Sequence, residues 1–227
     1  MKRLLRLGHR YVSLLVSIQL LLWTISGIFF AFNQIQQVRG EHVREAQPIN
    51  VDLSSFKLET GPAQSVRFAS RLGQPVVVVT KAGEKHYRVP SGNTVAMLTP
   101  QEAIEAVHIG TTLVAIDVEF VDKVAPGDEY RGRALPLYRV VAEDAEATQY
   151  NVYLNPYTSE IVAVRSERWR IWDLMWGLHI MDWRARDDIH NLPMKIFSLL
   201  ALISGLTGIG LFFSSRRRVS SISMQSD

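Results

Sequence analysis

Aromatic and imidazole side chains recur at helical spacing in the run ERWRIWDLMWGLHI, residues 167–180. Spacings of three, four and three residues place the following side chains on one helical face: Trp169, Trp172, Trp176 and His179. Tryptophan is favoured at the membrane–water interface because its ring is apolar and its indole N–H still reaches water. This face is typical of an amphipathic helix that anchors a domain on a bilayer. It also fits one wall of an aromatic pocket for a flat ligand such as haem, a quinone or a siderophore.

Three of the six histidines lie within a few residues of a predicted membrane boundary: His9, His179 and His190. An imidazole at such a boundary must be hydrated, hydrogen-bonded or bound to a metal, and the sequence leaves these roles open. The remaining histidines occur in soluble segments without the paired spacing of metal ligands, and we expect surface or helix-capping roles for them: His42, His86 and His108.

The loop after the tryptophan-rich run concentrates ionisable side chains: Asp182, Arg184, Arg186, Asp187, Asp188 and His190. Carboxylates and an imidazole this close could hold a divalent cation through oxygen-rich ligation. Asp–Arg pairs that stiffen the loop are the simpler interpretation, and we predict no metal site.

The chain of 227 residues contains no cysteine, so disulfides, thiolate metal sites, iron–sulfur clusters and cysteine nucleophiles are excluded. It also lacks a Gly-rich phosphate loop, a Gly-x-Ser-x-Gly elbow and a His-Glu-x-x-His helix. A self-contained hydrolase or nucleotide enzyme does not fit this sequence. Any chemistry must use histidines, carboxylates, hydroxyls or a bound cofactor, and whether the chain is an enzyme stays open.

Two uncharged apolar stretches, residues 11–32 and 196–215, have the length of about 20 residues that is needed to cross a bilayer. A fully soluble protein is therefore excluded. The first stretch is longer than the roughly 7–15 apolar residues of a signal peptide, and Ala31-Phe32-Asn33 is a poor cleavage site. We expect it to remain as an anchor.

Charge around these stretches predicts the orientation of the chain. The first ten residues carry four positive charges, the tail after the second stretch carries three against Asp227, and residues 33–195 carry 18 basic and 21 acidic residues, a balance of −3. Positive ends stay in the cytoplasm, so we expect the middle segment to lie outside. The basic clusters follow this topology, and the outer segment has no basic stripe with interleaved aromatic residues, so we expect no nucleic-acid partner.

Small residues four apart in the second stretch, Ala201 with Gly205 and Ser204 with Gly208, allow close helix pairing in lipid. Ordinary tolerance of glycine in membrane helices explains them equally well. In the first stretch, further small or polar residues could face the same partner: Gln19, Thr24, Ser26 and Gly27. Two spans are half of a four-helix bundle, so we expect a homodimer or a partner membrane protein besides membrane lipid.

The outer segment has the pattern of an α+β domain. Residues 33–52 are polar and predict a stalk or a helical continuation of the first span, and Gly61-Pro62 predicts a helix over residues 63–72. Thr99 and Glu102 form a capping box that begins a second helix. Alternating or β-branched runs predict the strands 75–80, 85–89, 113–121, 137–142, 149–154 and 160–164. A helix followed by antiparallel strands, seen twice, predicts a tandem arrangement in which each helix covers one sheet face.

The run from Thr99-Pro-Gln-Glu-Ala to Tyr150-Asn-Val-Tyr-Leu-Asn-Pro-Tyr-Thr-Ser-Glu-Ile-Val resembles a PepSY domain. That family has a Thr/Ser-x-x-Glu-Ala cap and a last hairpin of the form Tyr-x-Val-x-Leu-Asp-Pro-x-Thr-Gly-Glu-Ile. Asn155 replaces the usual Asp and Ser159 the usual Gly; Asn tolerates left-handed conformations and Ser bonds locally, so turn chemistry can accommodate both. The flanks, His9-Arg10 before one span and GLHIMDWR (177–184) before a second span ending in SGLTG (204–208), resemble PepSY-associated transmembrane proteins.

This resemblance covers nearly the whole chain and implies a membrane α plus α+β fold. Two transmembrane helices would flank a periplasmic PepSY-like domain of short helices on antiparallel sheet. In four-span PepSY membrane proteins of iron uptake and siderophore reduction, histidines on the spans bind haem, which implies His9, His179 and His190 as axial ligands. The aromatic-pocket interpretation adds Trp172 and Trp176. A span of about 20 residues is about 30 Å long, so His9 cannot share an iron with the other two and would need a partner from a second copy or another protein.

Two functions follow from the resemblance. The first is an accessory or electron-transfer-linked subunit in iron, siderophore or related redox uptake, binding haem as a dimer. The rival is a non-enzymatic periplasmic module that contacts or inhibits peptidases or other envelope proteins through a sheet edge. The predicted boundaries are a cytoplasmic N-terminus at 1–10, a first transmembrane helix at 11–32, a PepSY-like region at 33–165, an interfacial aromatic helix with its return loop at 166–193, a second transmembrane helix at 194–215 and a cytoplasmic tail at 216–227.

Overall fold

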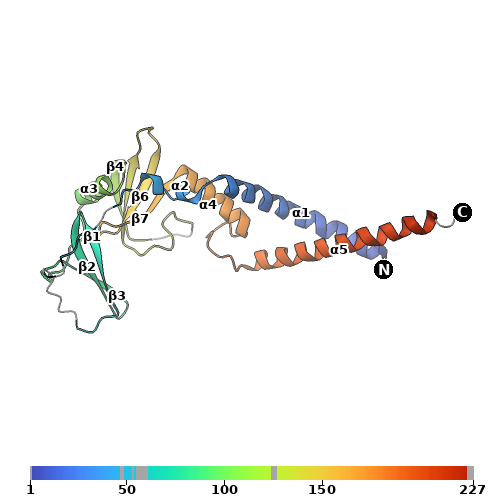
Figure 1. The fold of residues 1–227 in the computed structure, drawn as a ribbon, viewed down its shortest axis with the longest axis horizontal. Helices are drawn as coiled ribbons and strands as arrows, with labels where there is room; N and C mark the ends of the chain where they lie inside the picture. The colour runs from blue at the N-terminus through green and yellow to red at the C-terminus, as the bar shows by residue number, and fades with distance from the viewer. Residues whose placement is uncertain (1, 47–48, 53, 55–60, 124–126, 224–227) are drawn as a thin grey trace. The chain divides into compact units, whose positions relative to one another are not determined.

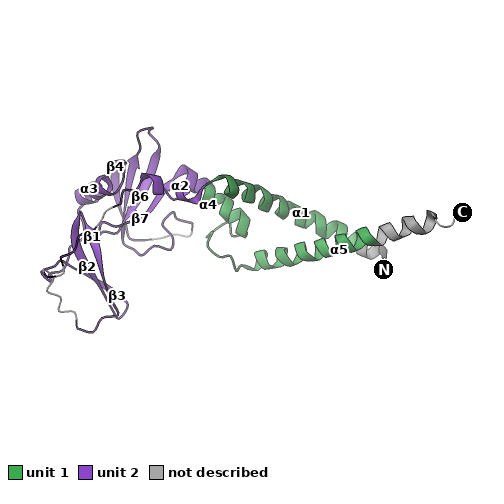
Figure 2. Ribbon diagram, in the orientation of Figure 1, with its two compact units in different colours: residues 1–33, 172–227 green, residues 34–171 purple. Residues whose placement is uncertain are grey.

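The computed structural model describes the chain except for residues 1, 47–48, 53, 55–60, 124–126 and 224–227 (Figure 1). It divides into two compact units (Figure 2). Unit 1 consists of Met1–Asn33 and Trp172–Asp227, and unit 2 of Gln34–Ile171.

Two long apolar helices dominate unit 1: α1 (Lys2–Phe32) and α5 (Leu192–Ser223), which pack side by side. The stretches Arg6–Phe32 and Leu192–Phe213 are long and apolar enough to cross a membrane. Their large apolar side chains are mostly exposed, as at Leu14, Ile18 and Leu206, which a soluble protein would bury in its core. Both predicted spans lie within these helices.

The tryptophan-rich run forms α4 (Glu167–Ile180), the helix that the spacing predicts, and its second half belongs to unit 1. The helix ends at Ile180, and the next residue, Met181, has a φ of +56° that reverses the chain, while the N–H of Asp182 donates to the Gly177 carbonyl at 3.1 Å. A loop then leads to α5.

A four-stranded antiparallel sheet forms the centre of unit 2, in the order β4 (Val114–Val121), β5 (Leu137–Glu143), β6 (Gln149–Leu154) and β7 (Ile161–Ser166). Helix α3 (Pro100–Gly110) covers one face, where its Ala103 and Val107 are fully buried against Val140, Val152 and Leu154. The opposite face packs Leu137 and Tyr153 against loop residues Tyr130 and Leu135. These strands and α3 confirm the sequence-based prediction for this half of the domain.

The predicted capping box of α3 is present. Thr99 Oγ1 accepts from the Glu102 backbone N–H at 3.2 Å, and Glu102 Oε2 accepts from the Thr99 backbone N–H at 2.7 Å. Two otherwise unpaired donors at the helix start are thereby satisfied.

A second sheet contains β1 (Ser65–Arg71), β2 (Gln74–Lys81) and β3 (Glu84–Arg88), in that order. The predicted helix over 63–72 is therefore wrong. Residues Leu72 and Gly73 have φ of +51° and +80° and form a two-residue hairpin turn that pairs Arg71 with Gln74. Gly73 thus closes a hairpin and not a helix, and the tandem helix-plus-sheet arrangement is also wrong in its first half.

The polar segment after α1 is neither a stalk nor a helical continuation of the span. Helix α1 ends at Phe32, and the chain then forms α2 (Ile35–Val38) and the 3-10 helix η1 (Glu41–Val43). Gly40, at φ +67°, leaves no room for a side chain, because a Cβ there would lie 2.7 Å from Val164 Cγ1. Val43 is buried in the core of unit 2. This segment is therefore part of the folded domain.

The turn between β6 and β7 contains the two departures from the PepSY pattern. Asn155 Oδ1 accepts from the backbone N–H groups of Tyr157 and Thr158 at 2.9 and 3.1 Å. Ser159 has a left-handed φ of +53°, and its hydroxyl accepts from the Leu72 N–H at 3.0 Å. The serine therefore has the left-handed conformation usual for glycine, with its strain, and its hydroxyl links the two sheets of unit 2.

Candidate functional site

One face of α1 carries polar side chains that contact the other helices of unit 1. Near its start, Ser13 Oγ lies 2.6 Å from Ser204 Oγ of α5. Further along, Gln19 donates to the Leu178 carbonyl at 3.3 Å and Trp23 Nε1 donates to the His179 carbonyl at 2.6 Å, both on α4. Polar groups inside a membrane helix pair are costly, so this face is where function is expected.

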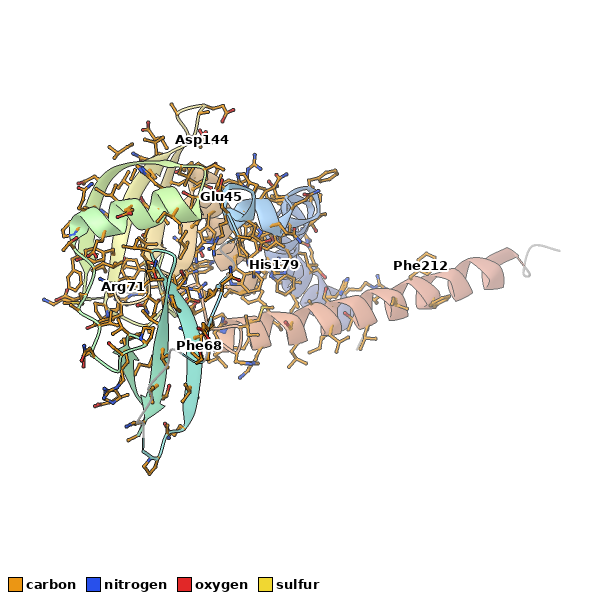
Figure 3. The ribbon with its side chains drawn as sticks, turned by 60° about the vertical axis from the view of Figure 1, so that its left-hand side comes forward. Glu45, Phe68, Arg71, Asp144, His179 and Phe212 are labelled. Atoms are coloured by element: carbon orange, nitrogen blue, oxygen red, sulfur yellow. The ribbon has the colours of Figure 1, made fainter. Side chains whose placement is uncertain are left out.

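His179 is held by a serine of α1 (His179 is labelled in Figure 3). Ser26 Oγ lies 2.8 Å from His179 Nδ1 and 2.8 Å from the Leu22 carbonyl. The hydroxyl can accept from Nδ1–H of the imidazole while it donates to the Leu22 carbonyl. Nε2 of His179 is hydrogen-bonded by none of the described residues.

Aromatic rings surround this imidazole. Trp172 and Trp176 are stacked with centroids 5.6 Å apart at 14°, and Trp176 and His179 with centroids 6.4 Å apart at 10°. Phe30 of α1 lies against all three rings, at 5.1 Å from Trp172, 6.3 Å from Trp176 and 5.7 Å from His179. Three of the four side chains that the helical spacing singles out therefore form one parallel stack, which we call the tryptophan–histidine stack.

The fourth, Trp169, has different neighbours. Its ring lies 4.3 Å from the Arg165 guanidinium and 5.6 Å from that of Arg131, both in unit 2. Trp169 therefore belongs to a cation–π cluster.

His9 of α1 contacts a hydroxyl of α5 in the same way that His179 of α4 contacts Ser26. Its Nδ1 lies 2.8 Å from Thr207 Oγ1, which also donates to the Ile203 carbonyl at 2.8 Å. While Thr207 donates to that carbonyl, its Oγ1 can accept from Nδ1–H of His9. Ser13 Oγ lies 3.4 Å from both ring nitrogens of His9. A Cβ on Gly208 would lie 3.3 Å from His9 Cε1. The small residues Ser204 and Gly208 therefore face α1 within the chain.

The structure does not bring all the predicted histidines together. Ser26 and His9 are 17 residues apart on one helix, so the two imidazole sites are separated by about 25 Å along α1. His190 is exposed, and its backbone N–H donates to Asp188 Oδ1 at 2.8 Å. Sequence reasoning named His9, His179, Trp172 and Trp176 but missed their partners Thr207, Trp23 and Phe30, because ordinary hydrophobic or hydroxyl residues in a span give no local signal.

An ion pair holds the loop that follows α4. Arg186 Nη1 donates to Asp173 Oδ2 at 2.7 Å, and Asp173 is only 2% exposed. Gly177 lets the arginine pass, because a Cβ there would lie 2.9 Å from Arg186 Cγ. An Asp–Arg pair was expected in this loop, but its acid comes from α4.

Asp182 organises the same loop through the backbone. Burial raises the pKa of its carboxyl, but N–H donation from Asp188, Asp187 and Ala185 outweighs burial and lowers the pKa below the ordinary value. Among the described residues, no three His, Asp or Glu side chains are grouped to hold a bare metal ion.

The tryptophan–histidine stack can be tested against the needs of haem, the cofactor that the resemblance implies. A histidine ligand offers a nitrogen lone pair, which His179 Nε2 has when Nδ1 carries the proton, and its other nitrogen is commonly held by a hydrogen-bond partner, as Ser26 would hold Nδ1. The flat rings of Trp176 and Phe30 suit the apolar body of a porphyrin. His179 near the end of α1 and His9 near its start would each supply one histidine ligand to a haem. A second ligand at either site would have to come from outside the chain.

A separate cavity of about 260 Å³ lies in unit 2. Its lining includes Arg44, Glu45, Arg67, Phe68, Ser70 and Ile161. The lining includes residues of β1 and β7, each an edge strand of its sheet. Two ordered interactions border it, from Arg44 Nη1 to the Ile161 carbonyl at 3.1 Å and between Arg67 and Glu160 at 3.0 Å.

Comparison with known proteins identifies the family. No curated protein and no solved structure gives a significant match to the chain. A family model described as the PepSY-associated TM region matches residues 5–225, which includes both membrane helices and the sheets between them. Two long apolar helices with exposed surfaces, a central domain of antiparallel sheets and this match together make the chain a membrane protein that belongs to the PepSY-associated TM family.

Proposed function

We propose that this protein is an accessory or electron-transfer-linked subunit in iron, siderophore or related redox uptake across a bacterial inner membrane. Both ends of the chain lie in the cytoplasm and the central domain in the periplasm. The charge balance of +4 and +2 at the ends against −3 between them supports this orientation.

The observation that carries the proposal is the repeated histidine arrangement in unit 1. His179 Nδ1 lies 2.8 Å from Ser26 Oγ, and His9 Nδ1 lies 2.8 Å from Thr207 Oγ1. In each ring this leaves Nε2 as the candidate ligand atom, and Ser13 Oγ lies 3.4 Å from Nε2 of His9. The two sites are about 25 Å apart along one span, a separation that suits a carrier of electrons across a bilayer.

Haem, when bound, supplies a one-electron redox centre. His179 and His9 are the residues that would hold it, and Ser26 and Thr207 fix the orientation of these rings. Trp172, Trp176 and Phe30 keep water from the outer position. Each chain offers one histidine at each level, so a homodimer or a partner membrane protein supplies the second ligand. His190 remains a weaker candidate because its ring is exposed.

The direct test is a reduced-minus-oxidised absorption spectrum of the full chain, purified from membranes of cells supplied with haem. We expect a haem absorption band that changes on reduction, that is lost or shifted in His179→Ala and that is unchanged in His86→Ala, a soluble-domain control. Protein that stays colourless, or a band indifferent to His9, His179 and His190, would remove the redox proposal.

Orientation has its own test. A reporter active only in the periplasm should work when inserted at the exposed Gly83 turn of unit 2 and fail when fused after residue 218. Periplasmic activity of the C-terminal fusion would overturn the two-span topology.

A second function is favoured by the cavity between β1 and β7. Its lining combines apolar side chains such as Phe68 with charged ones such as Arg44 and Arg67 at two sheet edges, which suits an extended peptide that adds to an edge strand. In this alternative the protein is a non-enzymatic module that contacts or inhibits peptidases or other envelope proteins. Phe68→Glu should then abolish capture of a periplasmic partner and leave any visible spectrum unchanged, whereas His179→Ala should do the reverse.

A further inference from the structure

The points where the chain enters and leaves unit 2 lie side by side. Arg168 Nη1 donates to Gln37 Oε1 at 2.7 Å. Gln37 follows the last residue of α1 by five positions, and Arg168 is the second residue of α4. Helix α4 is continuous from Glu167 to Ile180, so only a few residues along the chain separate this corner from the membrane unit.

Arginines gather at this corner around Trp169. The Arg165 guanidinium lies 4.3 Å from the centre of the indole ring and that of Arg131 lies 5.6 Å from it. Arg133, two residues along the same loop as Arg131, is exposed. We call Arg131, Arg133, Arg165 and Trp169 the arginine corner.

Among the described residues, no carboxylate is hydrogen-bonded to Arg165, the buried member of the arginine corner. Arg165 is 8% exposed, and its Nε and Nη1 donate to the backbone carbonyls of Glu129 and Val164, both at 3.0 Å. The nearby carboxylate of Glu129 is already engaged by Arg170 at 2.5 Å, Asn151 at 2.8 Å and Tyr153 at 3.1 Å.

The pKa of Arg165 reflects its burial and the charges around it, with Arg133 lowering it and Glu129 raising it. Burial lowers the pKa of Arg165 to about 10, and repulsion from Arg133 adds to this effect. A buried guanidinium normally has an anionic partner, so the chain leaves this charge partly uncompensated.

We propose that the arginine corner binds the phosphate groups of anionic membrane lipids. Guanidinium groups recognise phosphate oxygens through paired N–H donors, and tryptophan is favoured at the depth of the head groups. Each arginine near an anionic surface adds to membrane affinity. Arg133 is exposed and Arg131 is half-buried, with Nη1 3.3 Å from the Asp128 carbonyl, whereas Arg165 adds its charge from below the surface. This lipid site involves neither His9 nor His179, so it stands or falls separately from the haem proposal.

The test uses the full chain in detergent, with bound lipids counted by native mass spectrometry as phosphatidylglycerol or phosphatidylcholine is added. The variant Arg131→Gln/Arg133→Gln removes two charges while the buried Arg165 stays in place. Lys85→Gln is the control, because Lys85 is an exposed cation on β3 of the other sheet. Inorganic phosphate is titrated as a competitor.

We expect wild-type protein to retain phosphatidylglycerol over phosphatidylcholine, the double variant to lose on the order of tenfold in this preference, and Lys85→Gln to match wild type. Unfolding temperature and elution volume report folding, and Arg133→Gln alone, at an exposed position, should lose part of the preference if the double variant proves unstable. Equal retention of the two lipids, or an unchanged preference in both corner variants, would overturn the proposal. If inorganic phosphate at equal concentration displaces the lipid, the site binds phosphate itself and the proposal of a lipid ligand is wrong.

Discussion

Glu129 of unit 2 and His179 of unit 1 are both partly buried polar groups, yet they use their hydrogen-bonding capacity differently. Both carboxylate oxygens of Glu129 are occupied, by Arg170 on one and by Asn151 and Tyr153 on the other. His179 uses Nδ1 on Ser26 and leaves Nε2 to no described residue. A carboxylate whose two oxygens are both hydrogen-bonded stabilises the fold, whereas an oriented imidazole with one nitrogen that no described residue hydrogen-bonds can bind a ligand.

The largest effect on stability should come from removing Glu129. Glu129→Ala leaves Arg170, Asn151 and Tyr153 without their common acceptor, and we expect a loss of about 2–3 kcal/mol in the free energy of unfolding. Glu160→Ala is the matched control, because its pair with Arg67 is half exposed on both sides and should contribute about 0–1 kcal/mol. Denaturant unfolding of the full chain measures both, and equal losses would remove the distinction drawn for Glu129.

The same carboxylate predicts a dependence on pH. Burial raises the pKa of Glu129, but donation from Arg170 and Asn151 outweighs burial, and the pKa lies below the ordinary 4.5. Its stabilisation is therefore fully present above pH 4.5 and is lost as the pH falls through the lower pKa of the folded state. The difference in unfolding free energy between wild type and Glu129→Gln should shrink below pH 4.5. A difference that stays constant from pH 7 to pH 3 would contradict this assignment.

In unit 1 the hydroxyl partners should affect ligand retention and not stability. Ser26→Ala frees Nδ1 of His179, and loss of such a partner should weaken haem retention about tenfold. Ser17→Ala is the control, because Ser17 donates only to the Ser13 carbonyl on the exposed side of α1. Spectral titration with haem measures the affinity of each variant. Identical affinities would show that Ser26 does not orient the His179 ring for haem.

A smaller loss is expected at the start of α3. Thr99→Ala removes the acceptor for the Glu102 N–H and should cost about 0.5–2 kcal/mol in unfolding free energy, with no change in any haem spectrum. A shift in the spectrum would show that the two units are coupled in a way that the histidine sites do not explain.

The smallest effects concern Ser159. Ser159→Ala loses the bond to Leu72 and keeps the left-handed strain at φ +53°, so it should cost about 1 kcal/mol. Ser159→Gly loses the same bond but relieves the strain, and should stay within about 0.5 kcal/mol of wild type. Differential scanning of the two variants compares them, and a glycine variant less stable than the alanine variant would contradict the strain argument.

Elements with strong local signals were predictable from the sequence. The capping box fixed the start of α3, alternating residues predicted β4 to β7, and helical spacing predicted α4 from Glu167 to Ile180. Residues 63–72 were misassigned, because a proline and a glycine flank hairpin strands as readily as helices. Residues 33–43 were misassigned because tertiary packing of Val43 decides their structure and their polar composition does not.

The candidate site was predictable only in part, for a related reason. Histidines and tryptophans near a span are conspicuous in a sequence, and periodicity placed Trp172, Trp176 and His179 on one face. The partners Ser26 and Thr207 come from helices 153 residues before and 198 residues after their histidines, and no local pattern encodes such pairs. The separation of Trp169 from the stack likewise depends on Arg165 and Arg131, which lie outside α4.

The central claim, that His179 of α4 and His9 of α1 are two separate ligand sites at different levels of α1, is tested most directly by the haem content per chain. Wild type, His9→Ala, His179→Ala and the double variant would be purified in full length from haem-supplied cells, with His86→Ala as the control. We predict that each single variant loses one of two spectrally distinct centres, that the double variant loses both and that the control loses none. Equal haem content in all five proteins, or none in wild type, would contradict the account.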